Sequence, residues 1–480
     1  MLLHPTSLPS DAPVGNLGID AYRFIDFLRD AGMTVWQVLP LGPTVPMGSP
    51  YQCESAHAGN VWLIDLHALS ACGWLSGDVT PPTDCEAWIT WHADQLRHAR
   101  EGFLVHAGPG DRRAYEDFCA HNHHWLEDYA LFRALSHEHR GLPWWEWAPE
   151  LRGRDAATLA ATRARLDEVL DQHRFEQFLF YRQWSALKRY ANERDILLFG
   201  DMPIFVAHNS ADVWAEPQYF DLDDQGHPRH VAGVPPDYFS ATGQRWGNPL
   251  YAWDAMYADG FRWWERRLQT METQFDLIRV DHFRGFQAYW SIPATEDTAI
   301  NGHWVDAPGD ELFTRLRERL GDLPLVAEDL GIITPEVEAL RDAYGLPGMK
   351  ILQFAFDGSP DNPYLPDHHV ENGVIYTGTH DNDTSLGWFE SLDGKSQAYV
   401  REFLGEPEEP MPWPLIRAAL ASVARLAMMP LQDLLELDGR YRMNVPGTES
   451  DNWNWRFRWD QVPDDLVARM RHLLELYDRL

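Results

Sequence analysis

The chain has 480 residues, 45% of them hydrophobic and 24% charged, which is the composition of a globular protein with an extensive core. Its formal net charge of −33 would repel phosphates, which argues against nucleic acids and anionic membranes as partners. A stretch of about 18 apolar residues and a signal peptide are both missing, so we expect a cytoplasmic protein whose four cysteines are reduced.

Short apolar runs recur along the chain, and most of them end in a polar or charged residue. They are Met1–His4, Thr34–Leu39, Ile196–Asp201, Phe275–Asp281, Leu323–Glu328, Met349–Phe354, Val374–His380 and Ala427–Leu434. Such runs, with amphipathic stretches between them, are typical of buried parallel strands with helical crossovers. Because eight strands close a TIM barrel, we predict a single α/β chain, residues 1–480, with the (β/α)8 fold.

The stretches between the runs predict helices and two large insertions. The helices expected beside the barrel are Asp20–Ala31, Arg174–Arg194, Gly260–Thr273 and Thr334–Tyr344. The long gap after the second strand holds helix-like segments at Ala87–His106, Glu116–Glu138 and Asp155–Asp171, so we predict a mainly helical insertion subdomain over residues 60–175. The gap after the third strand is rich in Pro, Gly, Asp and aromatic residues, and residues 205–258 are predicted to form an active-site wall and a lid loop.

Three carboxylates, Asp281, Glu328 and Asp381, each follow a different predicted strand. A lone Asp at a strand end is more often a helix cap or a turn residue. Three on separate strands of one barrel, however, would converge at its carboxyl-terminal mouth. Cleavage of an acetal needs a proton for the leaving oxygen and a negative group near the developing oxocarbenium carbon. The trio therefore favours chemistry on glycosidic bonds.

Neighbouring residues indicate a division of labour among the three. Arg279 lies two residues before Asp281, so both side chains point to the same side of the strand, where the positive charge would keep Asp281 ionised and nucleophilic. A structural ion pair is the alternative. Glu328 ends an apolar run, and burial beside an anion would raise its pKa, as a general acid requires. Asp381, next to His380, could bind sugar hydroxyls and help to set the pKa of Glu328.

Other chemistries find less support in the sequence. The segments DLDDQG (221–226) and HDND (380–383) lack the spacing of a calcium loop, so no metal is predicted. Phosphate-binding loops, dinucleotide fingerprints and a G-x-S-x-G elbow are absent, so neither a cofactor nor a serine hydrolase is expected.

Motifs along nearly the whole chain then point to one family. They are LLHPTSLPS (2–10), GSPYQCESAHAGN (48–60), GDMPIFVAHNSADVWA (200–215), VAGVPPDYFSATGQRWGNPLY (231–251), IRVDHFRGF (278–286), VAEDLG (326–331), GMKILQFAF (348–356), TGTHDNDTSLGW (377–388) and RMNVPGTESDNWNWR (442–456). Together they resemble the 4-α-glucanotransferases called amylomaltase or disproportionating enzyme. The resemblance implies retaining transfer of α-1,4-glucan segments from maltooligosaccharides, amylose or glycogen-derived glucans to the 4-hydroxyl of an acceptor, with cyclisation left open.

The resemblance also implies roles for individual residues. Asp281 would be the nucleophile, Glu328 the general acid/base and Asp381 the carboxylate that stabilises the transition state. The residues that would contact sugar are Tyr51, Asp201, Asp237, Gln244, Trp246, Arg279, His282, Phe354, His380 and Asn444. Without the family, core histidines at positions 282 and 380 and a packed surface loop at 233–249 would be the simpler interpretations.

Two alternatives to a transferase stay open at this point. The first is an α-amylase-like retaining hydrolase, which would use the same three carboxylates. The second is a non-catalytic glucan-binding protein, against which the intact trio argues.

Overall fold

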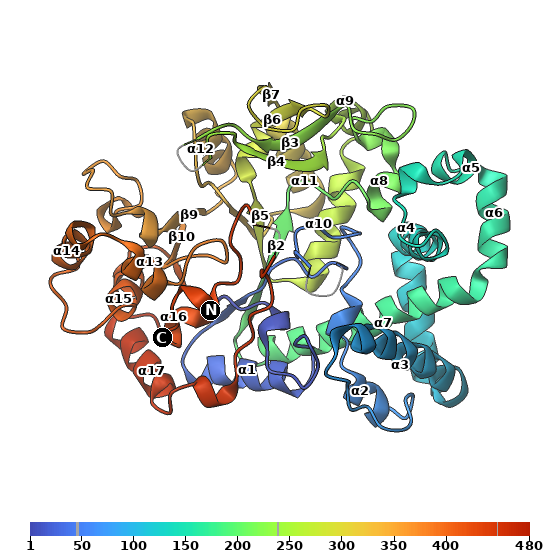
Figure 1. The fold of residues 1–480 in the computed structure, drawn as a ribbon, viewed down its shortest axis with the longest axis horizontal. Coiled ribbons are helices and arrows are strands. Elements are labelled where there is room, and N and C mark those ends of the chain that lie inside the picture. Colours follow the sequence, from blue (N-terminus) through green and yellow to red (C-terminus); the bar gives the residue numbers. More distant parts are fainter. Residues whose placement is uncertain (45–47, 238–239, 449) are drawn as a thin grey trace.

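The computed structural model describes residues 1–44, 48–237, 240–448 and 450–480, with parallel strands at its centre (Figure 1). Their pairing forms two arcs that close into a ring. The first arc pairs β1 (Val35–Gln37), β2 (Leu197–Pro203), β5 (Leu277–Asp281) and β8 (Leu325–Ala327) in that order. The second arc pairs β9 (Gly348–Ile351), β10 (Gly373–Tyr376) and β11 (Leu426–Met428). Leu2 bridges the arcs by pairing with Gln37 and Pro430, and Ala327 N donates to Pro347 O at 2.8 Å on the other side. The predicted TIM barrel is confirmed.

Several strands are shorter than the apolar runs that predicted them. Met1–His4 contributes only the two bridges of Leu2. The last run was predicted to continue to Leu434, but its strand ends at Met428, and α16 (Leu431–Leu434) follows Pro430. Proline has no N–H for the ladder and is well tolerated just before a helix, which explains the early end. Apolar character alone does not mark where a strand stops.

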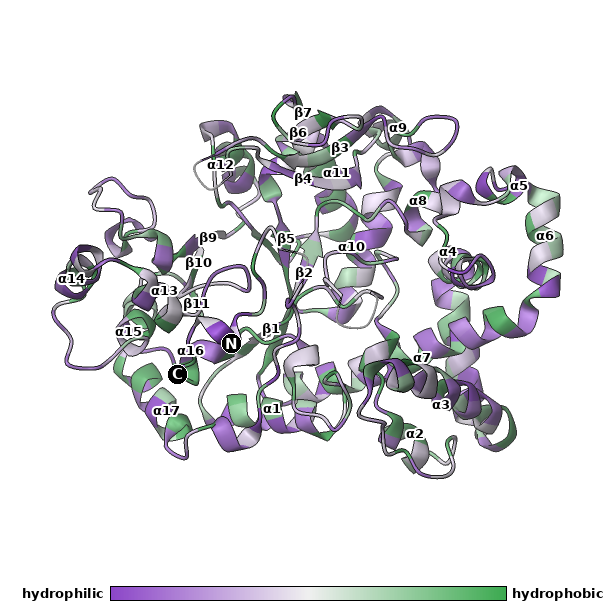
Figure 2. Cartoon of the chain, in the orientation of Figure 1, coloured by the Kyte–Doolittle hydropathy of each residue, from purple (hydrophilic) through white to green (hydrophobic). Residues whose placement is uncertain are grey.

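Helices surround the ring. Those outside the insertions are α1 (Ile19–Asp30), α10 (Arg262–Gln274), α11 (Gly309–Leu320), α12 (Pro335–Ala343), α13 (Ser385–Ser391), α14 (Gly394–Phe403), α15 (Trp413–Ala421) and α17 (Leu466–Leu476). Within the described ranges, no helix is both long enough and apolar enough to cross a bilayer. Figure 2 shows that the helices around the barrel carry both hydrophobic and hydrophilic surfaces, as expected for elements that cover a core on one side.

A group of helices follows β1 and precedes β2, on the right in Figure 1. Its members are α2 (Leu66–Ala71), α3 (Cys85–His106), α4 (Pro109–Glu138), α5 (Pro149–Arg152), α6 (Ala156–Arg165) and α7 (Asp167–Asn192). The prediction of a single helix over Asp155–Asp171 is wrong, because α6 and α7 are separate helices with Leu166 between them. Arg163 and Arg165 favour a helix end, and Asp167 and Glu168 favour a helix start, which suits this division. The subdomain boundaries 60–175 stay a prediction.

The segment after β2 is more ordered than the predicted wall and loop. It contains α8 (Ala211–Ala215), β3 (His230–Val234), β4 (Gln244–Pro249) and α9 (Trp253–Ala258). The strands join β6 (Ala288–Pro293) and β7 (His303–Asp306) in an antiparallel sheet of order β4-β3-β6-β7, at the top in Figure 1. Because β6 follows Asp281 closely, the sheet adjoins the carboxyl end of β5. Tyr238 and Phe239, within the predicted lid at 233–249, lie outside the described residues.

The barrel interior is filled from its strands. One buried cluster takes residues from six of them: Val35, Phe199, Val326, Met349, Ile351, Val374, Tyr376 and Met428. Side chains of this kind pack the inside of a barrel in layers, so the interior is a core and not a channel. Polar residues at the carboxyl ends of the strands therefore lie above an apolar floor.

Candidate active site

A buried arginine organises the mouth of the barrel. Arg279 on β5 contacts both oxygens of Asp201 through Nη1, at 2.7 and 2.9 Å, and Asp281 through Nη2, at 3.0 Å. The side chain of Asp281 is 29% exposed, whereas those of Arg279 and Asp201 are almost fully buried. The predicted common orientation of Arg279 and Asp281 is confirmed. The guanidinium stabilises the negative charge of a carboxylate that ligands can reach.

The tightly buried pair of Asp201 and Arg279 is further tied to Tyr51. The Tyr51 hydroxyl donates to Oδ2 of Asp201 at 2.8 Å. Burial raises the pKa of Asp201 to about 6, against the opposing effect of Arg279. For Arg279, burial alone would lower the pKa, but the carboxylates of Asp201 and Asp281 outweigh it and raise the pKa well above its usual value. The guanidinium is therefore a permanent positive charge beneath Asp281.

Glu328 follows β8, the neighbour of β5, and is 9% exposed. Its Oε2 accepts a hydrogen bond from His282 N at 2.7 Å, and its Oε1 accepts one from Leu330 N at 3.0 Å. Burial raises the pKa of Glu328 to about 7; Arg279 opposes the rise and Asp281 adds to it. The expected raised pKa is confirmed, and its two predicted causes, burial and a nearby anion, both act. A carboxyl with this pKa can both give and take a proton near neutral pH.

Asp381 lies in the turn after β10 and has a different environment. Its Oδ1 accepts from Asn444 Nδ2 at 2.7 Å, and its Oδ2 lies 3.3 Å from His380 Nε2. Burial would raise the pKa of Asp381, but His380 and Asn444 outweigh it and lower the pKa. The same contact raises the pKa of His380 against the opposing effect of burial. Asp381 is thus held as an anion, while its predicted influence on the pKa of Glu328 stays a prediction.

Aromatic rings form one wall beside this carboxylate. The Tyr51 ring stacks on His380 with centroids 5.2 Å apart, and Trp453 lies 6.0 Å from His380 and 6.2 Å from Tyr51. Trp453 was not predicted as a site residue, although it lies in the NWNW motif. Its backbone has φ of 66°, a conformation that is rare and costly for a bulky residue. The strain at Trp453 is consistent with a functional position for its ring.

On the other side of Asp281, His282 faces the segment predicted as a lid. The His282 ring meets Trp246 edge to face at 4.9 Å, and Trp246 Nε1 donates to Gln244 Oε1 at 3.2 Å. His282 also has a positive φ of 54°, and its buried Nε2 has no hydrogen-bond partner among the described residues. Burial lowers the pKa of His282 to about 4, so the ring is neutral. Contact between His282 and a sugar stays a prediction.

The remaining predicted residues lie at the edge of this arrangement. The Asp237 carboxylate accepts from Ser240 N at 2.7 Å, within its own turn. Phe354 follows β9 and meets the Tyr364 ring edge to face at 5.5 Å. Burial raises the pKa of Tyr364 to about 12, and the carboxylates of Asp329 and Glu328 add smaller effects, so Tyr364, which was not predicted as a site residue, lies near Glu328. No short motif marks Tyr364, because only folding brings its loop to Glu328.

These contacts join most of the predicted residues into one mouth. Tyr51, Asp201, Arg279, Asp281, His380, Asp381 and Asn444 form a continuous chain of contacts, while Glu328 is joined to it through His282 and the field of Arg279. Trp246 and Gln244 are joined to Glu328 through His282. For every predicted residue, contact with a ligand stays a prediction. Over the described ranges, no group of three or more His, Cys, Asp or Glu residues is arranged to hold a metal ion.

Comparison with known proteins identifies the family. A family model described as 4-alpha-glucanotransferase matches residues 3–462. The 4-alpha-glucanotransferases of Thermus thermophilus and Synechocystis are 49% and 48% identical to this chain, over all of it and over 98% and 97% of their own lengths. A solved amylomaltase from Streptococcus agalactiae in complex with acarbose is 38% identical, covers 100% of this chain and 98% of its own, and superposes with a TM-score of 0.95. The chain therefore belongs to the 4-alpha-glucanotransferase family, and it is an enzyme of the transferase class, as its motifs predicted.

Proposed function

We propose that the chain is a retaining 4-α-glucanotransferase in which Asp281 is the nucleophile and Glu328 the general acid/base. The observation that carries the proposal is the contrast between the two carboxyls. Asp281 is accessible and paired with Arg279, whereas Glu328 is buried with a pKa of about 7. Carboxyls whose environments differ in this way divide the acid and base roles between them.

In the first step, a carboxylate oxygen of Asp281 attacks the anomeric carbon of the donor. The bond from that carbon to the leaving 4-oxygen breaks, and protonated Glu328 gives its proton to that oxygen. The donor's non-reducing segment is then covalently bound to Asp281, and its reducing-end segment departs. Asp381, kept anionic by Asn444 and His380, lies beside the same mouth and stabilises the positive charge that develops on the sugar.

In the second step, the carboxylate of Glu328 takes the proton of an acceptor's 4-hydroxyl. The acceptor oxygen attacks the anomeric carbon, the bond to Asp281 breaks, and a new α-1,4 bond forms. Two displacements retain the configuration, and both carboxyls return to their starting protonation states. No metal or cofactor takes part in either step.

Maltooligosaccharides, amylose and glycogen-derived glucans are the proposed substrates. Tyr51, Asp201, Arg279, His282, His380 and Asn444 would surround the sugar before the scissile bond, and Asp237, Gln244, Trp246 and Phe354 would contact the acceptor. The 233–249 segment would act as a lid, because excluding water favours a sugar hydroxyl over hydrolysis at the covalent intermediate.

A cytoplasmic location is part of the proposal. It is supported by the cysteines, since Cys53, Cys72, Cys85 and Cys119 are all free thiols. Free thiols are typical of reducing compartments. Cell fractionation with a cytoplasmic marker enzyme would test it, and recovery with a membrane or exported fraction would contradict it.

Maltotriose distinguishes transfer from the two alternatives. Transfer predicts glucose together with oligomers longer than maltotriose. An α-amylase-like hydrolase would give only shorter sugars, and a non-catalytic glucan-binding protein would leave maltotriose unchanged. Either of the last two results would overturn the proposal.

A further inference from the structure

The segment 48–60 reaches from the active site into the helical layer beside the barrel. Tyr51 lies near its start and bonds Asp201, whereas its second half turns sharply among α4, α7, α8 and α10. At that turn, Ser55 Oγ accepts hydrogen bonds from His57 N and Ala58 N, both at 3.1 Å. The turn is buried, so its remaining polar groups depend on protein partners.

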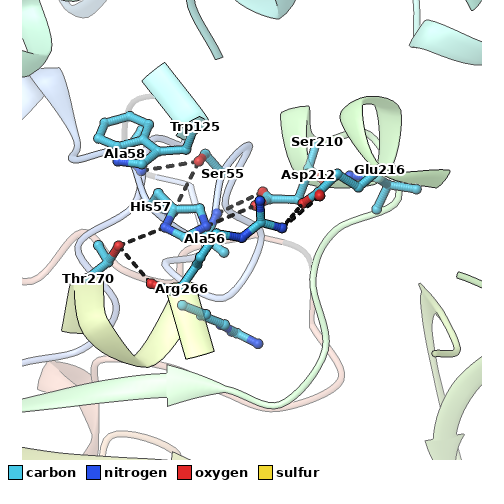
Figure 3. Close-up of polar contacts among 12 residues, drawn as sticks. Ser55, Ala56, His57, Ala58, Trp125, Ser210, Asp212, Glu216, Arg266 and Thr270 are labelled. Carbon is cyan, nitrogen blue, oxygen red and sulfur yellow. Dashed lines mark hydrogen bonds and ion pairs between the residues drawn. The ribbon is translucent and has the colours of Figure 1, made fainter. Parts of the chain in front are cut away.

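Asp212, on the short helix α8, supplies one of these partners. Its Oδ2 accepts from Ala56 N at 2.8 Å (Figure 3). The preceding Ala211 N donates to Glu54 O at 2.8 Å. The side chain of Asp212 is 4% exposed. A buried carboxylate is costly unless it is well bonded, and here it is used to hold the main chain of a segment that continues to the active site.

His57 fixes the same turn from the opposite direction. Its Nδ1 lies 2.8 Å from Thr270 Oγ1 on α10, its ring stacks on Trp125 at 5.9 Å, and its Nε2 lies 4.0 Å from Asp212 Oδ1 (Figure 3). Burial lowers the pKa of His57 well below its usual value and raises that of Asp212 to about 6. The His57 ring is therefore neutral and lies between Asp212 and Thr270.

Further contacts anchor the turn to α7. Gln177 receives a hydrogen bond from Gly59 N at 2.7 Å and donates one to Gly59 O at 3.0 Å. These bonds on both sides leave the turn little freedom, and Tyr51 is only four residues from Ser55. A shift of the turn would be carried to the Tyr51 ring and hydroxyl, and from there to Asp201 and Arg279.

We propose that Asp212 is a positioning residue, which acts on the reaction by holding the 48–60 segment so that Tyr51 meets Asp201 and His380. It touches no substrate. The inference rests on the proposed function, because it needs Tyr51 to line the sugar-binding mouth. In this proposal, helices outside the barrel help to shape the mouth.

A double-mutant cycle tests the proposal, with maltotriose disproportionation by the folded protein as the readout. Asp212→Ala and Tyr51→Ala should each lower kcat/KM by roughly tenfold or more, since small misplacements of a binding group carry costs of this size. If Asp212 acts through Tyr51, the double variant should be no worse than Tyr51→Ala. Losses that multiply would overturn the proposal.

Two further variants separate positioning from a general structural role. Asp212→Asn keeps an oxygen for Ala56 N and should restore most of the activity that Asp212→Ala loses. Glu216→Ala breaks the neighbouring ion pair with Arg266, whose Nη2 lies 2.7 Å from Glu216 Oε1, and should leave kcat/KM unchanged. A loss in Glu216→Ala equal to that in Asp212→Ala would show that any damage near α8 has this effect, and would contradict the proposal.

The experiment also distinguishes a folding defect from a failure of the proposed function. If Asp212→Ala does not fold, Thr270→Val takes its place in the cycle, because it removes the partner of His57 Nδ1 with little change of volume. Wild-type protein that fails to disproportionate maltotriose would overturn the proposed function itself. Active wild-type protein with multiplicative losses would overturn only the role of Asp212.

Discussion

The main-chain N–H of His282 donates a hydrogen bond to Oε2 of Glu328 at 2.7 Å, so the residue after the proposed nucleophile holds the proposed acid/base. His282 makes this contact from a left-handed backbone conformation, with φ of 54°. The carboxyl ends of β5 and β8 are thereby joined at the reaction centre, and the geometry depends on strain at one residue.

That strain predicts a difference between two truncations of His282. Both His282→Gly and His282→Ala should lower kcat/KM, because both remove the ring beside Trp246. Glycine adopts positive φ freely, so the Gly variant should be more stable than the Ala variant by about 1 kcal/mol. Denaturant unfolding measures the difference; an Ala variant as stable as the Gly variant would show that the backbone is unstrained.

The pKa of Glu328 predicts a pH profile. The first step needs its protonated form, so kcat/KM should fall as pH rises through about 7. Glu328→Gln should lose activity at every pH while remaining folded. Initial rates on maltotriose between pH 5 and about 9 test this. If a Gln variant with residual activity still shows the same fall in kcat/KM at high pH, that fall belongs to another group.

The same pKa predicts a stability change in Glu328→Gln. A carboxyl whose pKa rises from 4.5 to about 7 on folding contributes stability below pH 4.5, and that contribution is lost as pH rises through about 7. Gln does not ionise, so the free energy of unfolding of the Gln variant should rise relative to that of the wild type by up to about 3 kcal/mol between these limits. Paired unfolding curves at pH 4.5 and pH 8 measure the gain. A constant difference across this range would contradict the burial argument.

Asp281→Asn should reduce turnover at least about a thousandfold, because an amide cannot form the covalent intermediate. Affinity for maltooligosaccharides should persist, since the loss is of a reacting group. Turnover assays and calorimetric titration together check the prediction. Retention of substantial turnover would remove Asp281 from its proposed role.

The hydrogen bond from Asn444 should help to keep Asp381 ionised. Asn444→Ala removes the 2.7 Å hydrogen bond to Oδ1, whereas Asn444→Asp places a second negative charge there. Like charges raise each other's pKa, so the Asp variant should lose more activity than the Ala variant, by roughly a further tenfold. The kcat/KM values of the two variants decide it, and equal losses would mean that Asp381 does not depend on this contact.

The periodic part of the structure, the barrel, could be predicted from local sequence patterns. Apolar runs located the barrel strands, and strand-end carboxylates located the mouth, because the carboxyl ends of parallel strands share one edge. The antiparallel sheet was missed because β3, which also pairs with β4, pairs with β6, a strand that lies beyond β5 in the sequence. Polar, aromatic-rich segments also give a weak strand signal. Trp453 and Tyr364 were missed because tertiary contacts alone bring them to the site.

Trapping the covalent intermediate is the most direct test of the central claim. An α-maltosyl fluoride needs no acid to expel its leaving group, so Glu328→Gln should still form the intermediate but should transfer it slowly to a sugar. Intact-mass and peptide analysis should find one maltosyl group on the peptide that contains Asp281, and none in the Asp281→Asn, Glu328→Gln double variant. An adduct on another carboxylate, or rapid fluoride release with inverted product and no adduct, would contradict the account.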